Sequence, residues 1–213
     1  MAPTVKICGI STPETLDAAI AGGASHIGLV FFDKSPRYVD FARAASLAKR
    51  AAGKAWIVGL FVDPQAAYVE QACDQVGLDI IQLHGDESPS FVAQTRAKGV
   101  QELWKALPIR TTADLGIASR YLGAADRLLY DAKPPLDADR PGGNGMRFDW
   151  SLLTEFRHPL PWILSGGLDS ANLAEAVRTT RADMLDVSSG VESTPGVKDM
   201  DKIAAFLKAA HSL

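Results

Sequence analysis

A chain of 213 residues, 47% of them hydrophobic and 22% charged, has the composition of a globular protein and is long enough to bury a substantial core. Its net charge of −3 offers no basic surface for nucleic acid, and its two cysteines are too few for a disulfide framework or a four-cysteine zinc site. The N-terminal residues lack a signal-peptide pattern and no apolar stretch approaches the roughly 18 residues of a membrane span, so we expect a cytoplasmic protein without a membrane partner.

Short apolar runs of strand character alternate with segments of helical periodicity along the whole chain. The expected strands cover residues 5–10, 26–32, 55–62, 79–84, 102–107, 127–131, 161–165 and 184–188. The expected helices cover residues 13–21, 41–52, 64–76, 88–97, 112–122, 150–156, 170–178 and 200–210. Eight strands, each followed by a helix, predict a single-domain (βα)8 TIM barrel over residues 1–213. A doubly wound open sheet is the alternative, because alternation alone does not show closure.

Local signals mark several helix starts and one long loop. Thr12 and Asp63 each precede a proline, as an N-cap precedes a proline in the first helical turn. Asp169 and Asp199 are the expected caps of the last two helices. Residues 133–147 form an irregular stretch after the sixth expected strand, and a loop of this length in a compact domain is commonly functional.

Two small-residue turns follow the seventh and eighth expected strands. The first contains Gly166 and Gly167, and the second contains Ser188, Ser189 and Gly190. In barrels of this class the loops at these positions frequently bind phosphate, because glycine lets backbone N–H groups approach an anion closely. Each turn alone is equally compatible with an ordinary tight turn, but the two together predict a phosphate site.

Two reactive side chains end the first and sixth expected strands, where barrel active sites form. Asp131, at a partly apolar barrel mouth, is suited to be a general acid; pairing with Lys133 or Lys6 is the structural alternative. Cys8 shares a strand face with Lys6, and a cation at that distance would lower the pKa of the thiol. An inert buried thiol is the alternative for Cys8. Asp186, which lies deeper, fits an internal ion pair better than catalysis.

Arg37 and His84 are further candidates at the same end of the barrel. Arg37 follows a proline, and its guanidinium can hold a carboxylate by two parallel hydrogen bonds, although a surface arginine fits equally well. His84 can be an acid or base, a ligand, or a hydrogen-bonded barrel residue. No second histidine at metal spacing accompanies it, so we expect no metal.

Eight segments, in this order, resemble the phosphoribosylanthranilate isomerase family. They are KICGI, FFDKSPRYV, GLFVD, IIQLHGDE, LLYDAK, PGGNGMRFDW, ILSGGLDSAN and DVSSGVESTPGVKD, and the resemblance runs from Lys6 to about Asp201. It implies a (βα)8 barrel that uses neither cofactor nor metal. The implied reaction belongs to tryptophan biosynthesis: the Amadori rearrangement of N-(5′-phosphoribosyl)anthranilate to 1-(2-carboxyphenylamino)-1-deoxyribulose 5-phosphate.

The resemblance also assigns roles to individual residues. Cys8 is implied as the general base, Asp131 as the general acid, and Arg37 as the residue at the aromatic end of the substrate. The substrate-binding set is completed by His84, Gly142 and Gly143, and the phosphate set is Gly166, Gly167, Ser188, Ser189 and Gly190. The family usually has Ser or Thr where Asn144 follows the two loop glycines. We expect this phosphosugar–anthranilate as the only partner, and a monomer rather than a homodimer.

Other sugar-phosphate barrels are the nearest alternatives. A ribulose-phosphate epimerase would need metal-ligating histidines at the strand ends, where only His84 stands. The histidine-pathway isomerase uses two aspartates where this chain has Cys8 and Asp131. A phosphate-binding barrel without activity is the alternative of a different class, and the presence of Cys8, Arg37 and Asp131 argues against it.

Overall fold

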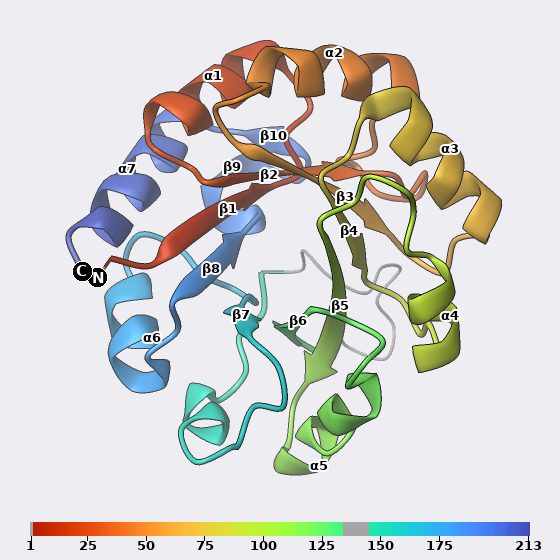
Figure 1. Ribbon diagram of the computed structural model, residues 1–213. Coiled ribbons are helices and arrows are strands. Elements are labelled where there is room, and N and C mark those ends of the chain that lie inside the picture. The colour runs from red at the N-terminus through yellow and green to blue at the C-terminus, as the bar shows by residue number, and fades with distance from the viewer. Residues whose placement is uncertain (1, 134–144) are drawn as a thin grey trace.

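Eight parallel strands close into a barrel in which each strand pairs with its chain neighbours and the eighth returns to the first (Figure 1). The computed structural model describes residues 2–133 and 145–213. The strands are β1 Thr4–Cys8, β2 His26–Val30, β3 Trp56–Phe61, β4 Ile80–Leu83, β5 Glu102–Ile109, β6 Arg127–Ala132, β7 Trp162–Leu164 and β8 Met184–Val187. All eight predicted strands are therefore confirmed, and closure rules out the open sheet.

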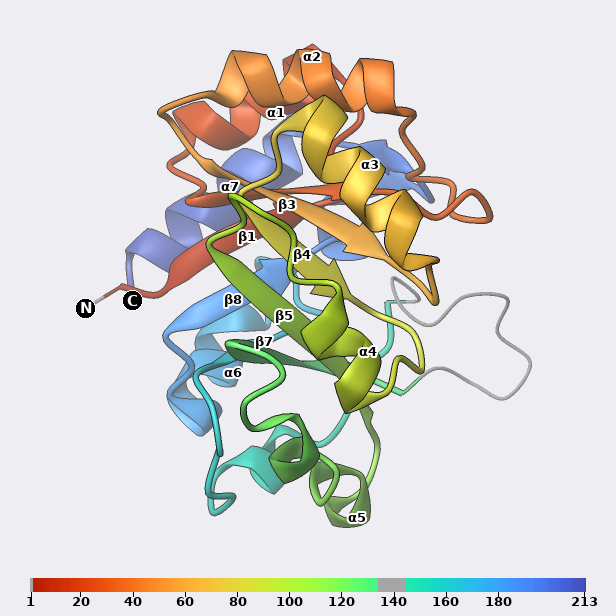
Figure 2. The ribbon, with the colours of Figure 1, turned by 45° about the vertical axis from the view of Figure 1, so that its right-hand side comes forward.

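The helices lie outside the barrel and cover it, as Figures 1 and 2 show. They are α1 Pro13–Ala21, α2 Phe41–Ala51, α3 Ala66–Val76, α4 Pro89–Gln94, α5 Thr112–Leu115, α6 Leu173–Thr180 and α7 Met200–His211, with 3-10 helices η1 Ala118–Tyr121, η2 Trp150–Leu153 and η3 Ser189–Val191. In α2 the buried positions Ala44, Leu47, Ala48 and Ala51 recur at helical spacing, so one face packs inward. The two termini lie next to each other (Figure 1).

Three predicted helices are shorter than expected, and the one predicted over 88–97 covers only Pro89–Gln94. The segment 112–122 divides into α5 and η1, because Gly116 ends the first of them. The segment 150–156 forms only the single 3-10 turn of η2. A two-stranded hairpin, β9 Glu192–Thr194 with β10 Val197–Lys198, follows β8 and was not predicted.

Two of the four predicted N-caps are confirmed and two are not. Thr12 and Asp199 accept hydrogen bonds from the first turns of α1 and α7, as expected. The Asp63 prediction is wrong: this residue has φ +44° and its carboxylate accepts from the Asp86 N–H at 2.7 Å, tying two loops together. Asp169 accepts from backbone N–H groups of the turn that precedes α6, and Asn172 occupies the N-cap position.

Apolar side chains close the floor of the barrel beneath its C-terminal mouth. The buried interior cluster comprises Val58, Ile80, Trp104, Ala106, Leu129, Ile163 and Met184. Most of these residues lie two positions before a polar or mouth-lining residue of the same strand. Because side chains alternate between the two faces of a strand, both members of each such pair point into the barrel, one level apart. Layering of this kind fills the barrel interior beneath the C-terminal mouth.

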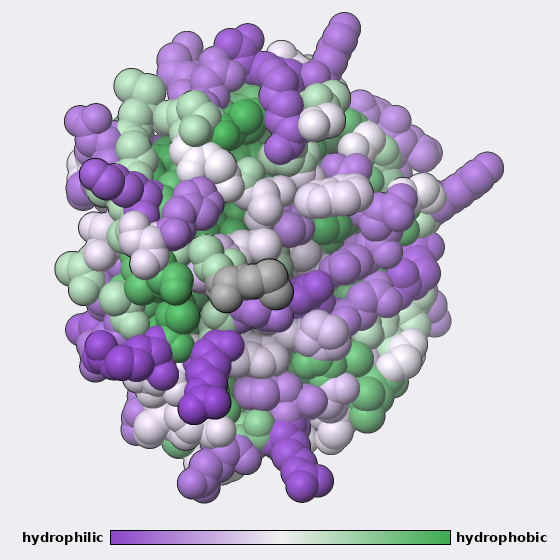
Figure 3. All heavy atoms as spheres, turned by 60° about the vertical axis from the view of Figure 1, so that its left-hand side comes forward, coloured by the Kyte–Doolittle hydropathy of each residue, from purple (hydrophilic) through white to green (hydrophobic). Residues whose placement is uncertain are grey.

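The molecular surface is mixed in character. On the face shown in Figure 3, hydrophilic side chains project outward and hydrophobic residues lie in small groups between them. Within the described ranges, no helix combines the length and apolar character needed to cross a membrane.

Candidate active site

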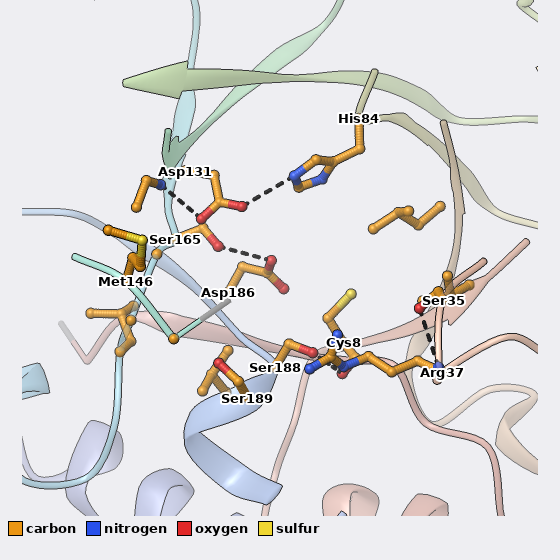
Figure 4. Close-up of a pocket in the computed structure, with 18 of the residues that line it drawn as sticks. Cys8, Ser35, Arg37, His84, Asp131, Met146, Ser165, Asp186, Ser188 and Ser189 are labelled. Atoms are coloured by element: carbon orange, nitrogen blue, oxygen red, sulfur yellow. Dashed lines mark hydrogen bonds and ion pairs between the residues drawn. The ribbon is translucent and has the colours of Figure 1, made fainter. Parts of the chain in front are cut away.

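A pocket opens at the C-terminal ends of the strands, where the sequence placed the reactive residues. Its polar lining residues are Cys8, Ser35, Arg37, His84, Asp131, Ser165, Asp186, Ser188 and Ser189. Figure 4 shows the Cys8 sulfur pointing into this pocket and His84 directed toward Asp131. Apolar side chains on β2 and β3 line the opposite wall, including Val30 and Leu60. The pocket therefore offers one polar, hydrogen-bonding side and one apolar side.

Cys8 ends β1 and is only 4% exposed. Its neighbour across the ladder is Gly28, where a Cβ would lie 2.9 Å from the Cys8 sulfur, so this glycine makes room for the thiol. Gly9 has φ +79°, and a Cβ there would lie 2.6 Å from Cδ of Arg37. Glycine at this turn thus lets the Arg37 side chain pass beside the end of β1.

The expectation of a lowered Cys8 pKa is wrong for the free protein. Burial raises the pKa of the thiol above its usual value, and Asp186 adds to this effect. Lys6 and Lys198 oppose the effect of burial without overcoming it. Desolvation of the thiolate dominates because Cys8 is almost fully buried.

Lys6 forms an ion pair with Asp186 inside the barrel. Its Nζ lies 2.8 Å from Oδ1 of Asp186, and both side chains are almost fully buried. Burial lowers the pKa of Lys6, but Asp186 and Cys8 together outweigh burial and the pKa is raised overall. The prediction that Asp186 forms an internal ion pair is therefore confirmed. Its second oxygen accepts from Ser165 Oγ at 3.3 Å and faces the pocket.

Asp131 pairs with neither lysine proposed as its structural partner. Its Oδ2 lies 3.1 Å from Nε2 of His84, and its Oδ1 accepts from the Ala132 N–H at 2.8 Å. His84 is in turn held through Nδ1 by Nε2 of Gln82, at 3.0 Å. His84 is thus a hydrogen-bonded barrel residue in contact with the candidate acid. Gln82 was missed by the sequence analysis, although it stands two residues before His84 on the same strand face.

Arg37 is not a surface arginine. It is 4% exposed, and its Nε and Nη2 donate to the two carboxylate oxygens of Glu192 at 2.7 and 2.8 Å. Lys198 donates to the same carboxylate at 2.6 Å. Burial raises the pKa of Glu192, but the bonds from Arg37 and Lys198 outweigh it, so its pKa is lowered. Sequence reasoning missed Glu192 and Lys198, because it did not foresee the hairpin that brings them together.

The two glycine-containing turns meet at the pocket as predicted. Gly166, Gly167, Ser188 and Ser189 line it, with Gly166 and Gly167 at φ +89° and +64°. Any Cβ at Gly166 would lie 2.6 Å from the Ala132 nitrogen, so the turn packs directly against the end of β6.

Three further predicted site residues, Gly142, Gly143 and Gly190, are not among the described residues that line this pocket. Gly190 packs against the Leu168 carbonyl, so it shapes the turn from behind. Gly142 and Gly143 lie outside the described residues. Across residues 2–133 and 145–213, no three His, Cys, Asp or Glu side chains gather as metal ligands do.

Similar proteins were found by sequence and by structure. A family model described as N-(5′-phosphoribosyl)anthranilate (PRA) isomerase matches residues 5–209. The N-(5′-phosphoribosyl)anthranilate isomerase of Paramagnetospirillum magneticum is 53% identical over 207 residues, covering 97% of this chain and 96% of that protein. The enzyme of the same name from Rhodospirillum centenum is 52% identical over 210 residues, covering 98% of each.

Solved structures give the same result. The phosphoribosyl anthranilate isomerase of Thermotoga maritima has a TM-score of 0.88 at 32% identity, covering 99% of this chain and all of that one. A phosphoribosyl anthranilate isomerase in complex with reduced 1-(o-carboxyphenylamino)-1-deoxyribulose 5-phosphate has a TM-score of 0.84 at 31% identity, with 99% and 100% coverage.

Proposed function

The chain belongs to the N-(5′-phosphoribosyl)anthranilate isomerase family, and from that membership we propose how its pocket carries out the isomerisation. The reaction is an Amadori rearrangement, in which an aminofuranose opens and becomes a 1-amino-1-deoxyketose. The observation that carries the proposal is the placement of Cys8 and Asp131 in one pocket, on β1 and β6, with β7 and β8 between them. A sugar held between these strands meets the two groups from different sides.

Asp131 acts as the general acid and Cys8 as the general base. Ring opening needs a proton on the ring oxygen, which Oδ2 of a neutral Asp131 delivers, and a protonated Schiff base results. The positive charge acidifies the proton on C2′, and Cys8 removes it as the thiolate. A cation on the substrate also opposes the rise that burial causes in the pKa of Cys8, so the base is favoured when it is needed. Each positioned proton transfer contributes about 10²–10⁴-fold.

The remaining pocket residues hold the two ends of the substrate. The turns with Gly166, Gly167, Ser188 and Ser189 bind the phosphate, whose binding energy fixes the sugar far from the reacting carbons. Arg37, fixed in orientation by Glu192, binds at the anthranilate end, where the carboxylate suits a planar guanidinium. The substrate-binding role of Gly142 and Gly143 stays a prediction.

Turnover of phosphoribosylanthranilate generated in situ tests the proposal. We expect conversion by the wild-type protein and a loss of at least about 10²-fold in kcat for Asp131→Asn and for Cys8→Ser, with binding of the reduced ketose product retained. Matched controls are Asp17→Asn, at an exposed ion pair, and Cys73→Ala, in α3. An inactive wild-type protein, or either site variant with most of its activity, contradicts the assignment.

Two expectations remain predictions beside this function. The cytoplasmic location is one of them. The other is the monomeric state, since the isomerase of Thermotoga maritima is described as dimeric and has also been crystallised as generated monomers. Light scattering at micromolar concentration decides the second, and a mass of two chains would contradict it.

A further inference from the structure

Gln82 is a buried polar residue whose presence inside the barrel needs a reason. Its side chain is completely buried, and its Oε1 has no hydrogen-bond partner among the described residues. An unsatisfied buried acceptor costs free energy that an apolar side chain would not incur. The other end of the amide is engaged, because Nε2 lies 3.0 Å from Nδ1 of His84. The contact with His84 is therefore what this amide contributes.

Asp131 is linked to that contact through the ring of His84. The Asp131 Oδ1 accepts the Ala132 N–H, so Oδ2 carries the proton when the acid is neutral. Oδ2 also faces Nε2 of His84 at 3.1 Å (Figure 4). A proton on Nε2 donates to Oδ2 and stabilises the carboxylate, whereas a bare Nε2 accepts from Oδ2–H and stabilises the neutral acid. The tautomer of His84 thus sets how firmly Asp131 holds its proton.

An amide side chain can serve either tautomer. With Nε2 of Gln82 toward the ring, Nδ1 accepts and the proton lies on Nε2 of His84. With the amide rotated by 180°, Oε1 accepts from Nδ1–H and leaves Nε2 bare to accept from Asp131. Both arrangements use the same heavy-atom positions, and each leaves one end of the amide without a partner.

We propose that Gln82 is the positioning residue of the general acid: its amide selects the tautomer of His84 and thereby the charge state of Asp131. The inference rests on the proposed function, in which Asp131 delivers a proton. The other ionisable groups that line the pocket are Cys8 and Arg37, together with Asp186 and its partner Lys6. Among the described residues, none of the hydrogen bonds of His84 involves these four, so the tautomer responds first to position 82.

Two substitutions at position 82 push the tautomer in opposite directions. In Gln82→Glu the carboxylate only accepts, so it holds a proton on Nδ1 and favours the neutral acid; its negative charge acts in the same sense. In Gln82→Met an Nδ1–H would be buried without a partner, and orphaned buried N–H groups are rare, so the Nε2–H tautomer and the carboxylate are favoured. In the wild-type protein the amide can serve either tautomer, so we expect its preference for the neutral acid to lie between those of the two variants.

The pH profile of kcat is the first readout. One limb reports the proton on Asp131, and we expect this limb to move up in Gln82→Glu and down in Gln82→Met, each by about one pH unit, which corresponds to one hydrogen bond. The other limb, which reports the base Cys8, stays in place. A purely structural role for Gln82 would lower kcat without shifting either limb.

Nitrogen-15 NMR of the His84 ring is the second readout and needs no turnover. We expect Nδ1 to be protonated in Gln82→Glu and bare in Gln82→Met, with His84→Gln used to assign the signals among the four histidines of the chain. In the wild-type protein Nδ1 should lose its proton over the same pH range as the limb that reports Asp131, which provides a test should a variant not fold.

The outcomes separate this inference from the proposed function. Active wild-type protein and inactive Asp131→Asn, with an Asp131 limb at the same pH and an unchanged His84 tautomer across the Gln82 series, overturn the role of Gln82 and leave the general acid standing. Wild-type protein without turnover overturns the function itself.

Discussion

Lys6 and Asp186 form a buried ion pair beneath the Cys8 thiol, and removing the lysine should lower the stability of the fold and change the titration of Cys8. The pair is separated by 2.8 Å, with side chains 0% and 5% exposed. At an effective dielectric constant of about 20, the attraction is roughly 6 kcal/mol, much of which offsets the desolvation of the two charges. Lys6→Met leaves the Asp186 carboxylate buried without a partner, and we expect a loss of roughly 3–5 kcal/mol in the free energy of unfolding.

The same substitution should move the titration of Cys8. Lys6 is the main group that opposes the effect of burial on the thiol, whereas Asp186 acts in the same sense as burial. The Cys8 pKa should therefore rise further in Lys6→Met and fall in Asp186→Asn. The rate of alkylation by a small reagent, measured against pH in a Cys73→Ala background, should shift to higher pH in the first variant and to lower pH in the second.

A double variant separates the pair from the two individual residues. Lys6→Met combined with Asp186→Leu removes both charges, and urea unfolding should show that it regains most of the stability lost in Lys6→Met. A Lys6→Met protein less stable than wild type by under about 1 kcal/mol would refute the energetic reasoning. An alkylation profile that stays in place or moves to lower pH would refute the electrostatic reasoning.

Three further changes test other parts of the site and barrel. Gly28→Ala places a methyl group 2.9 Å from the Cys8 sulfur, so we expect about tenfold lower kcat and a loss of roughly 1–3 kcal/mol in stability, measured by kinetics and urea unfolding. Glu192→Gln removes the carboxylate shared by Arg37 and Lys198, so KM should rise about tenfold or more in steady-state assays while kcat changes less. Burial lowers the pKa of His26 to about 4, so the unfolded chain binds this proton first and stability falls as pH drops from 6.5 toward 4; His26→Gln should remove about 2–3 kcal/mol of that fall.

Each of these changes has a matched control. Gly116→Ala, at the end of α5, should leave kcat unchanged, and Glu70→Gln, exposed on α3, should leave KM unchanged. His211→Gln, exposed at the end of α7, should keep the acid loss of stability seen in the wild type. The expectations for the three site and barrel variants are contradicted by a normal kcat in Gly28→Ala, by a normal KM in Glu192→Gln, and by a stability–pH curve of His26→Gln that runs parallel to that of the wild type.

The barrel was predictable from sequence because its strands and helices are specified by local patterns. Uniformly apolar runs such as the one from Ile27 to Val30 are covered on both faces, and Thr12 and Asp199 cap helices through contacts within four residues. Asp63 failed as a cap because a residue 23 positions later competes for its carboxylate. A pattern of neighbouring residues cannot predict a contact with a residue so far along the chain.

The site was predictable in its members and less so in their partners. Cys8 and Asp131 line the pocket because strand ends determine their place. The raised pKa of Cys8 was not foreseen, because it depends on desolvation and on Asp186, 178 residues away in the chain. The Arg37–Glu192 pair joins residues that lie 155 positions apart in the chain. It depends on the β9–β10 hairpin, which the hydrophobic pattern of the sequence did not predict.

Closure of the barrel joins the beginning of the chain to its end. β1 pairs with β8, and the Lys6–Asp186 contact spans 180 residues of sequence. On a growing chain emerging from the ribosome, the strand that carries Cys8 is made first and lacks one of its two neighbours until β8 has emerged. Contacts of such long range form late, since loop closure must precede them. The environment of the thiol and the completion of the fold are thus one event, and a chain truncated before β8 lacks the Lys6–Asp186 pair beneath Cys8.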